Sequence, residues 1–92
     1  MLIIPEMSEN AVLPVRVHLF ARYAELLGAS QVTVRVSAGG TVADVVDGVR
    51  ALPGGARLPE RMLVACGVDQ VRYDHPVRAD DELAFLPPMS GG

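Results

Sequence analysis

The sequence ends in Pro87-Pro88-Met89-Ser90-Gly91-Gly92, and this run is the part of the chain best suited to chemistry. The carboxylate that follows Gly92 is ionised at neutral pH, because an α-carboxyl group has a pKa of about 3.3–3.7. A carboxylate is a poor electrophile, so it reacts only after activation, for instance as an acyl-adenylate. Once activated, it can accept sulfur as a thiocarboxylate or be transferred to an amine.

The residues of this tail are small or extended, which favours entry into a narrow channel. Pro87 and Pro88 fix φ and direct the chain away from the preceding strand. Ser90 is small, and neither Gly91 nor Gly92 has a Cβ that would clash with a channel wall. Five residues from Pro88 span at most about 17 Å, enough to reach a partner's buried site. We therefore expect Gly92 to be the reacting residue, with Gly91 and Ser90 giving access; a simple frayed end is the alternative.

Other candidate chemistry in the chain is weak. Two histidines and one cysteine, far apart in sequence, do not have the spacing of metal ligands. His18 is expected on the surface, His75 in a structural turn, and Cys66 as a small buried apolar residue. No glycine-rich loop of the nucleotide-binding kind is present. We therefore expect no metal and no bound cofactor, and activation of the terminus must come from another enzyme that uses ATP.

Composition indicates an ordinary globular domain. The formal net charge of −3 argues against nucleic-acid binding, and one cysteine excludes an internal disulfide and indicates a reducing compartment. The N-terminus does not have the pattern of a secretory signal, and no apolar run approaches the 18 or more residues of a membrane span. These features predict a cytoplasmic protein without membrane contact. All eight basic residues are arginines, so lysine-linked chains of this protein on itself are impossible.

Hydrophobic periodicity predicts the elements that position the tail. Gly28 is expected to end a short helical segment, and Thr41 to cap the main helix, which continues to about Leu52. The predicted strands cover 15–20, 31–36, 62–67, 68–73 and 82–86, and the short helical segment covers 21–27. This order predicts an α+β fold, a mixed sheet of about five strands with one main helix packed on one face, as in the ubiquitin-like β-grasp.

Three regions follow from this assignment. Residues 1–14 mix apolar and polar residues, and we expect a mobile extension there. Residues 15–88 form the β-grasp domain, and residues 89–92 form a flexible diglycine tail.

Both faces of the last predicted strand are apolar. Leu83, Phe85 and Pro87 alternate with Ala84 and Leu86, and only one face can pack on the helix. The other face is exposed unless a partner covers it. Phe20 likewise points away from the apolar face of the first strand. These patterns predict a docking surface beside the tail, made by Phe20, Phe85, Leu86, Pro87 and Pro88; coverage by the N-terminal extension is the alternative.

From residue 15 onward, the chain resembles the MoaD family of the MoaD/ThiS superfamily, the small subunit of molybdopterin synthase. The most specific segment is Asp81–Gly92. Weaker matches are Leu19-Phe20-Ala21, Glu25-Leu26, Gly28, Thr41-Val42 and Asp74-His75-Pro76-Val77. The chain departs from the family at three positions: Ala24 replaces an arginine, Gly67 an asparagine and Asp80 a turn glycine. The last change is mild, because aspartate tolerates a left-handed turn.

The resemblance implies a non-catalytic sulfur carrier. An adenylating enzyme (MoeB-like) would activate Gly92 with ATP, and a sulfur donor would convert it to a thiocarboxylate. The large synthase subunit (MoaE-like) would then receive the tail, and the sulfur would pass to cyclic pyranopterin monophosphate to form molybdopterin.

Three other functions stay open at the level of the sequence. The chain could carry sulfur for thiazole, cysteine or tRNA thiolation. It could be a ubiquitin-like modifier joined to target lysines through Gly92. It could also be an inert interaction module whose terminal glycines are incidental.

Overall fold

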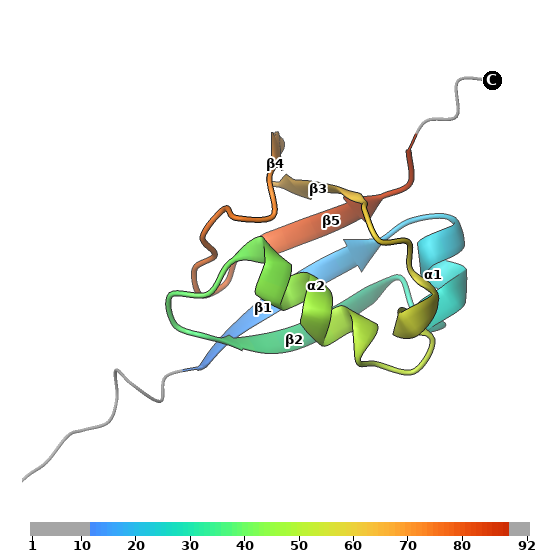
Figure 1. Ribbon diagram of the computed structural model, residues 1–92, viewed down its shortest axis with the longest axis horizontal. Coiled ribbons are helices and arrows are strands. Elements are labelled where there is room, and N and C mark those ends of the chain that lie inside the picture. The colour runs from blue at the N-terminus through green and yellow to red at the C-terminus, as the bar shows by residue number, and fades with distance from the viewer. Residues whose placement is uncertain (1–11, 89–92) are drawn as a thin grey trace, which may run out of the picture.

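A five-stranded mixed sheet with a helix across one face forms the domain (Figure 1). The computed structural model describes residues 12–88. Its strands are β1 (Val12–Leu19), β2 (Gln31–Ser37), β3 (Leu63–Cys66), β4 (Asp69–Val71) and β5 (Glu82–Leu86). Its helices are α1 (Arg22–Leu27), α2 (Val42–Arg50) and the 3₁₀ turn η2 (Gly55–Arg57). The predicted β-grasp is therefore confirmed.

The strand order β2-β1-β5-β3-β4 places the last strand in the middle of the sheet. β1 is antiparallel to β2 and parallel to β5, whereas β3 is antiparallel to both β5 and β4. A central strand has both edges hydrogen-bonded, which makes it a firm base for the segment that follows it. β5 ends close to α1, at the opposite end of the sheet from the start of β1 (Figure 1).

The first strand begins three residues earlier than predicted, at Val12 instead of residue 15. Pro14 falls within the predicted extension, yet it pairs with Arg35 of β2. The N–H of Arg16 points toward β5 and donates to the Asp81 carbonyl at 3.2 Å. Pro14, two residues earlier, has the same orientation, and β5 has not yet begun there, so its missing N–H leaves no gap in the sheet. Residues 1–11 of the predicted extension lie outside the described residues.

The main helix begins where Thr41 predicted it. The Thr41 N–H donates to the Asp44 carboxylate at 3.0 Å, the reciprocal contact of a capping box. The N–H groups of Val42 and Ala43 donate to the carbonyls of His75 and Tyr73 at 2.9 and 2.8 Å. These bonds satisfy donors that a helix start leaves without partners. The loop before β5 is thereby tied to α2.

The core lies between α2 and the inward face of the sheet. The buried side chains of α2 are Val42, Val45, Val46 and Val49, at helical spacing. They face the inward residues of β1, β2, β3 and β5, namely Val15, Val17, Leu19, Val34, Val36, Val64, Leu83 and Phe85. The opposite face of the sheet carries no helix among residues 12–88 and is referred to below as the open face.

Candidate docking surface and tail base

The central strand β5 sorts its apolar residues strictly by face. Leu83 and Phe85 are fully buried in the core, whereas Ala84 and Leu86 lie half-buried on the open face. The prediction that Phe85 contacts a partner is therefore wrong. Phe85 pairs with Leu19 of β1, another inward residue, and its side chain is fully buried in the core, so it is not available to another protein.

The open face carries a small apolar surface at the end where β5 finishes. Leu86 pairs with Leu63, and Ala84 pairs with Ala65, so these side chains form neighbouring cross-strand pairs. Phe20 directly follows β1 and is 47% exposed. We call these five residues the open-face patch. Phe20 and Leu86 thus remain candidates for partner binding.

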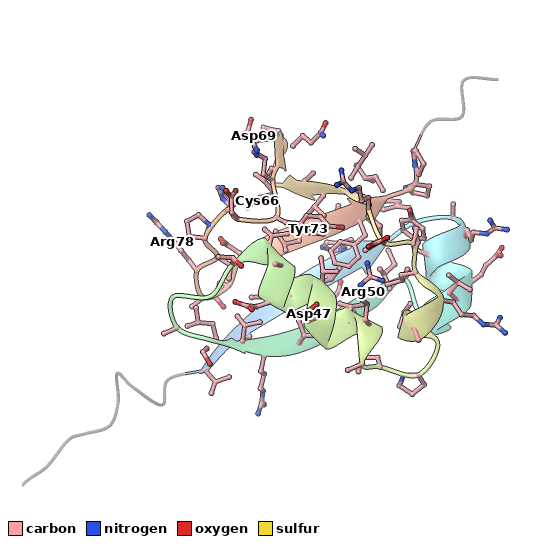
Figure 2. All side chains as sticks on the ribbon, in the orientation of Figure 1. Asp47, Arg50, Cys66, Asp69, Tyr73 and Arg78 are labelled. Carbon is pink, nitrogen blue, oxygen red and sulfur yellow. The ribbon has the colours of Figure 1, made fainter. Side chains whose placement is uncertain are left out.

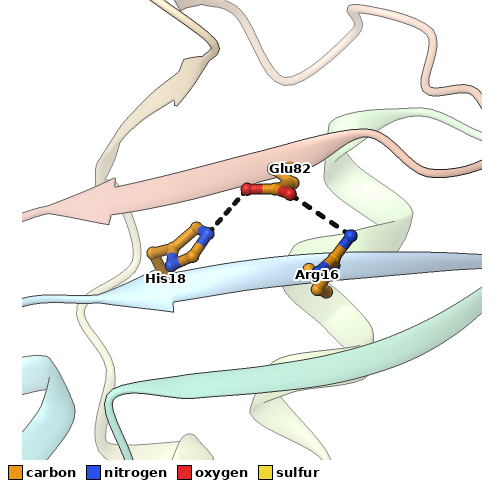
Figure 3. Close-up of polar contacts among 3 residues, drawn as sticks. All are labelled: Arg16, His18 and Glu82. Atoms are coloured by element: carbon orange, nitrogen blue, oxygen red, sulfur yellow. Dashed lines mark hydrogen bonds and ion pairs between the residues drawn. The ribbon is translucent and has the colours of Figure 1, made fainter.

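Charged side chains lie on the open face toward the start of β5, next to the apolar patch, since His18 pairs with Ala84 (Figure 3). Glu82 of β5 lies between two residues of β1, with its Oε2 atom 3.3 Å from a guanidinium nitrogen of Arg16 and its Oε1 atom 3.0 Å from Nε2 of His18. The hydrogen bond with His18 and, next, the charge of Arg16 lower the pKa of Glu82. His18 is on the outward face of β1, as predicted, and its ring nitrogen is engaged by Glu82. We call the three residues the charged cluster.

The chain leaves β5 through Pro87, which is half-buried, and Pro88, which is exposed. Both line an open groove of about 620 Å³ beside α1. The other lining residues are Ala21, Arg22, Tyr23, Leu26, Arg57 and Pro59. We call this feature the tail-base groove. The predicted reactive residue Gly92 and its neighbours Gly91 and Ser90 lie outside the described residues.

Sequence reasoning missed the tail-base groove. Arg22 belongs to α1 and Arg57 to η2, and nothing in the spacing of the chain brings them together. Arg50 of α2 shapes one wall, because its guanidinium donates to the carbonyls of Leu58, Pro59 and Glu60 at 3.0, 2.6 and 3.0 Å (Figure 2). A fully charged donor that satisfies three carbonyls fixes this loop. Pro59 is thereby held at the groove.

Other chemistry within residues 12–88 is limited. No three His, Cys, Asp or Glu side chains of this segment lie close enough together to hold a metal ion. Burial, and next the charges of Asp81 and Asp69, raise the pKa of the Cys66 thiol, so it stays protonated at neutral pH and is a poor nucleophile. In the same part of the chain, no helix is long and apolar enough to cross a membrane.

Comparison with known proteins identifies the family of the chain. The model of the ThiS family matches residues 17–92, which include β5, the tail-base prolines and the last four residues. The chain belongs to the ThiS family. Its sequence is 30% identical over 88 residues to the molybdopterin synthase sulfur carrier subunit of Arabidopsis thaliana. The match covers 95% of this chain and 92% of that relative.

Solved structures agree with this assignment. Small archaeal modifier protein 1 of Haloferax volcanii has a TM-score of 0.75 and 28% identity, over 86% of this chain and 99% of that one. A putative molybdopterin converting factor, subunit 1, of Pyrococcus furiosus has a TM-score of 0.73 over 84% of this chain and 99% of that one. At 19% identity, the second likeness shows the fold alone. The ThiS-family protein is thus a ubiquitin-like sulfur carrier of the MoaD/ThiS type.

Proposed function

We propose that this protein is the sulfur carrier subunit of molybdopterin synthase, with sulfur held as a thiocarboxylate on Gly92. The observation that carries this proposal is the similarity to the Arabidopsis thaliana sulfur carrier subunit along 95% of the chain. An adenylating enzyme activates the terminal carboxylate with ATP, and a sulfur donor replaces one oxygen. The tail then enters the large synthase subunit, where sulfur passes to cyclic pyranopterin monophosphate.

The arrangement of a firmly held strand, an apolar patch and a terminal segment of small residues suits a carrier without catalytic groups of its own. The tail follows β5, whose two hydrogen-bonded neighbours hold its base firmly. The open-face patch next to that base gives a partner an apolar surface to cover, which leaves the small terminal residues to enter its active site. Gly91 and Ser90 provide access, and Phe20, Leu86, Pro87 and Pro88 contribute to docking. No cofactor needs to be bound by the carrier itself, since ATP is used by the adenylating enzyme.

The first test is the intact mass of the protein isolated from its own host under non-oxidising conditions. Replacement of oxygen by sulfur adds about 16 Da, and the added mass is expected on Gly92. Hydrolysis should remove the added mass, whereas alkylation should increase it by the mass of the alkyl group. Only unmodified protein, even after incubation with an adenylating enzyme, ATP and a sulfur source, contradicts the carrier function.

A variant with one residue added after Gly92 provides the matched control. The extension displaces the carboxylate but leaves residues 12–88 unchanged, so the fold is expected to survive while sulfur loading and molybdopterin formation are lost. An extended protein that still supports molybdopterin synthesis contradicts the proposal.

A second candidate function is covalent modification of other proteins through Gly92. Similarity to small archaeal modifier protein 1, at 28% identity, favours it. Conjugates on target lysines survive thiol treatment, whereas thioester intermediates do not. Thiol-resistant conjugates in host extracts, lost when Gly92 is deleted, identify the modifier function; their absence together with the sulfur-loaded mass identifies the carrier.

A further inference from the structure

The tail-base groove carries two positive charges, Arg22 and Arg57, that form no ion pair with the described chain. Within residues 12–88, Arg22 and Arg57 form no ion pair, and their side chains make no hydrogen bond. Arg16 and Arg50, by contrast, have partners in Glu82 and in three carbonyls. Among residues 12–88, no carboxylate lines the groove, although the whole protein has a net charge of −3. The groove is thus a positive site on an acidic protein.

The two arginines are brought together by a close backbone contact. Gly54, just before η2, has φ +87°, and a Cβ there would lie 1.9 Å from the Leu26 carbonyl oxygen of α1. Only glycine allows this approach. The turn that carries Arg57 is therefore pressed against the helix that carries Arg22.

Residues of the groove and of the open-face patch are neighbours along the chain at two points. Phe20 of the patch is followed directly by Ala21 and Arg22 of the groove. Leu86 of the patch is followed directly by Pro87 and Pro88 of the groove. Ala21 has φ +52° and ψ −124°, a conformation that costs an L-residue energy. The patch and the groove therefore both border the point where the chain leaves β5.

We propose that the tail-base groove binds an acidic segment of the adenylating enzyme, with carboxylates of that segment paired to Arg22 and Arg57. Guanidinium groups bind carboxylates through paired hydrogen bonds, and groups of arginines are a recurring means of recognising acidic segments. The apolar walls formed by Leu26, Pro59 and Pro87 suit aliphatic residues beside those carboxylates.

We assign the tail-base groove to the adenylating enzyme because this enzyme must act on the carrier before any other partner. This inference rests on the proposed function, and every version of that function begins with the activation of the Gly92 carboxylate. The reaction takes place beyond Pro88, so the nucleotide belongs in the enzyme, while the groove contacts the enzyme's protein surface. Charge pairs at such a site steer association and fix the orientation of the carrier.

The test compares two double variants of the full chain in pyrophosphate release, with the host's adenylating enzyme and ATP. Arg22→Gln with Arg57→Gln removes the groove charges. Arg35→Gln with Arg78→Gln is the control, because Arg35 pairs with Pro14 near the start of β1 and Arg78 lies at the end opposite α1 (Figure 2). Each double variant loses two positive charges, which changes the net charge of the protein from −3 to −5. Any long-range repulsion that depends on net charge is therefore the same in the two variants.

The groove variant is expected to raise the KM for the carrier about tenfold, with kcat unchanged, whereas the control raises it less than about twofold. Salt raised from about 0.05 to 0.5 M should raise the KM of the native protein and of the control, and hardly that of the groove variant. Thermal stability should be unchanged in both, because neither arginine of the groove has a partner within residues 12–88.

Four outcomes overturn the inference. An unchanged KM shows that the groove does not bind the enzyme, while normal turnover of the native protein still upholds the carrier function. Equal KM increases in the two variants indicate a general effect of charge. A KM increase that salt does not change indicates apolar packing without carboxylates. A raised KM for ATP alone assigns the groove to the nucleotide. Failure of the native protein itself to be adenylated contradicts the proposed function instead.

Discussion

At the scale of single residues, the charged cluster is the clearest electrostatic feature of the open face. Glu82 is held between His18 and Arg16, and the hydrogen bond with His18 contributes most to its lowered pKa. A carboxyl group with a lowered pKa stabilises the fold above its unfolded-state pKa, and this contribution is lost as the pH falls through the lowered value. The cluster is therefore expected to be intact at neutral pH and to open in acid.

A carbon-detected NMR titration of the Glu82 carboxyl group measures this directly. We expect a midpoint below that of an ordinary glutamate. His18→Gln should raise the midpoint more than Arg16→Gln, because the hydrogen bond outweighs the more distant charge. The reverse order contradicts this assignment. In Glu82→Gln, the free energy of unfolding should fall less steeply as the pH is lowered into the acid range.

At the scale of elements, alternate residues of β5 have different roles. The inward residues stabilise the core, and the residues on the open face are available for docking. Phe85→Ala is expected to cost about 3–5 kcal/mol in the free energy of unfolding, the usual loss for a core phenylalanine. Leu86→Ala, on the half-buried open face, should cost about 1–2 kcal/mol, since less apolar area is removed from a packed site. Urea denaturation measures both.

Phe20→Ala completes the comparison, because this exposed side chain should change stability by less than about 0.5 kcal/mol. Its effect is instead expected on binding of the protein that receives the tail. A stability loss for Phe85→Ala no larger than that for Leu86→Ala would place the phenyl ring outside the core.

At the scale of the whole molecule, Gly54 joins the two parts that frame the tail-base groove. Gly54→Ala introduces both a strained φ and a clash with the Leu26 carbonyl, so we expect a loss of about 2–4 kcal/mol in unfolding free energy. Gly39→Ala is the matched control, because Gly39 has φ +88° but nothing within 4 Å of the added Cβ. It should cost about 1 kcal/mol, the strain alone. Equal losses would show that the approach of η2 to α1 is not tight.

Local signals in the sequence predicted the turns and caps well. Gly28 has φ +73° and ends α1 by donating to the Ala24 carbonyl at 2.8 Å. Thr41 begins α2, and Asp80 adopts φ +69°, a left-handed turn conformation that aspartate tolerates. These features depend on a few neighbouring residues, so sequence alone determines them.

What the sequence determined by itself was the alternation of apolar residues, hence the strands, the buried stripe of α2 and the β-grasp fold. Only the tertiary structure decided which face of β5 is buried. Both faces are apolar, and the pairing of Phe85 with buried Leu19 is what distinguishes them. The tail-base groove likewise exists only after folding, because it joins Arg22 to Arg57 across a backbone contact that no local pattern encodes.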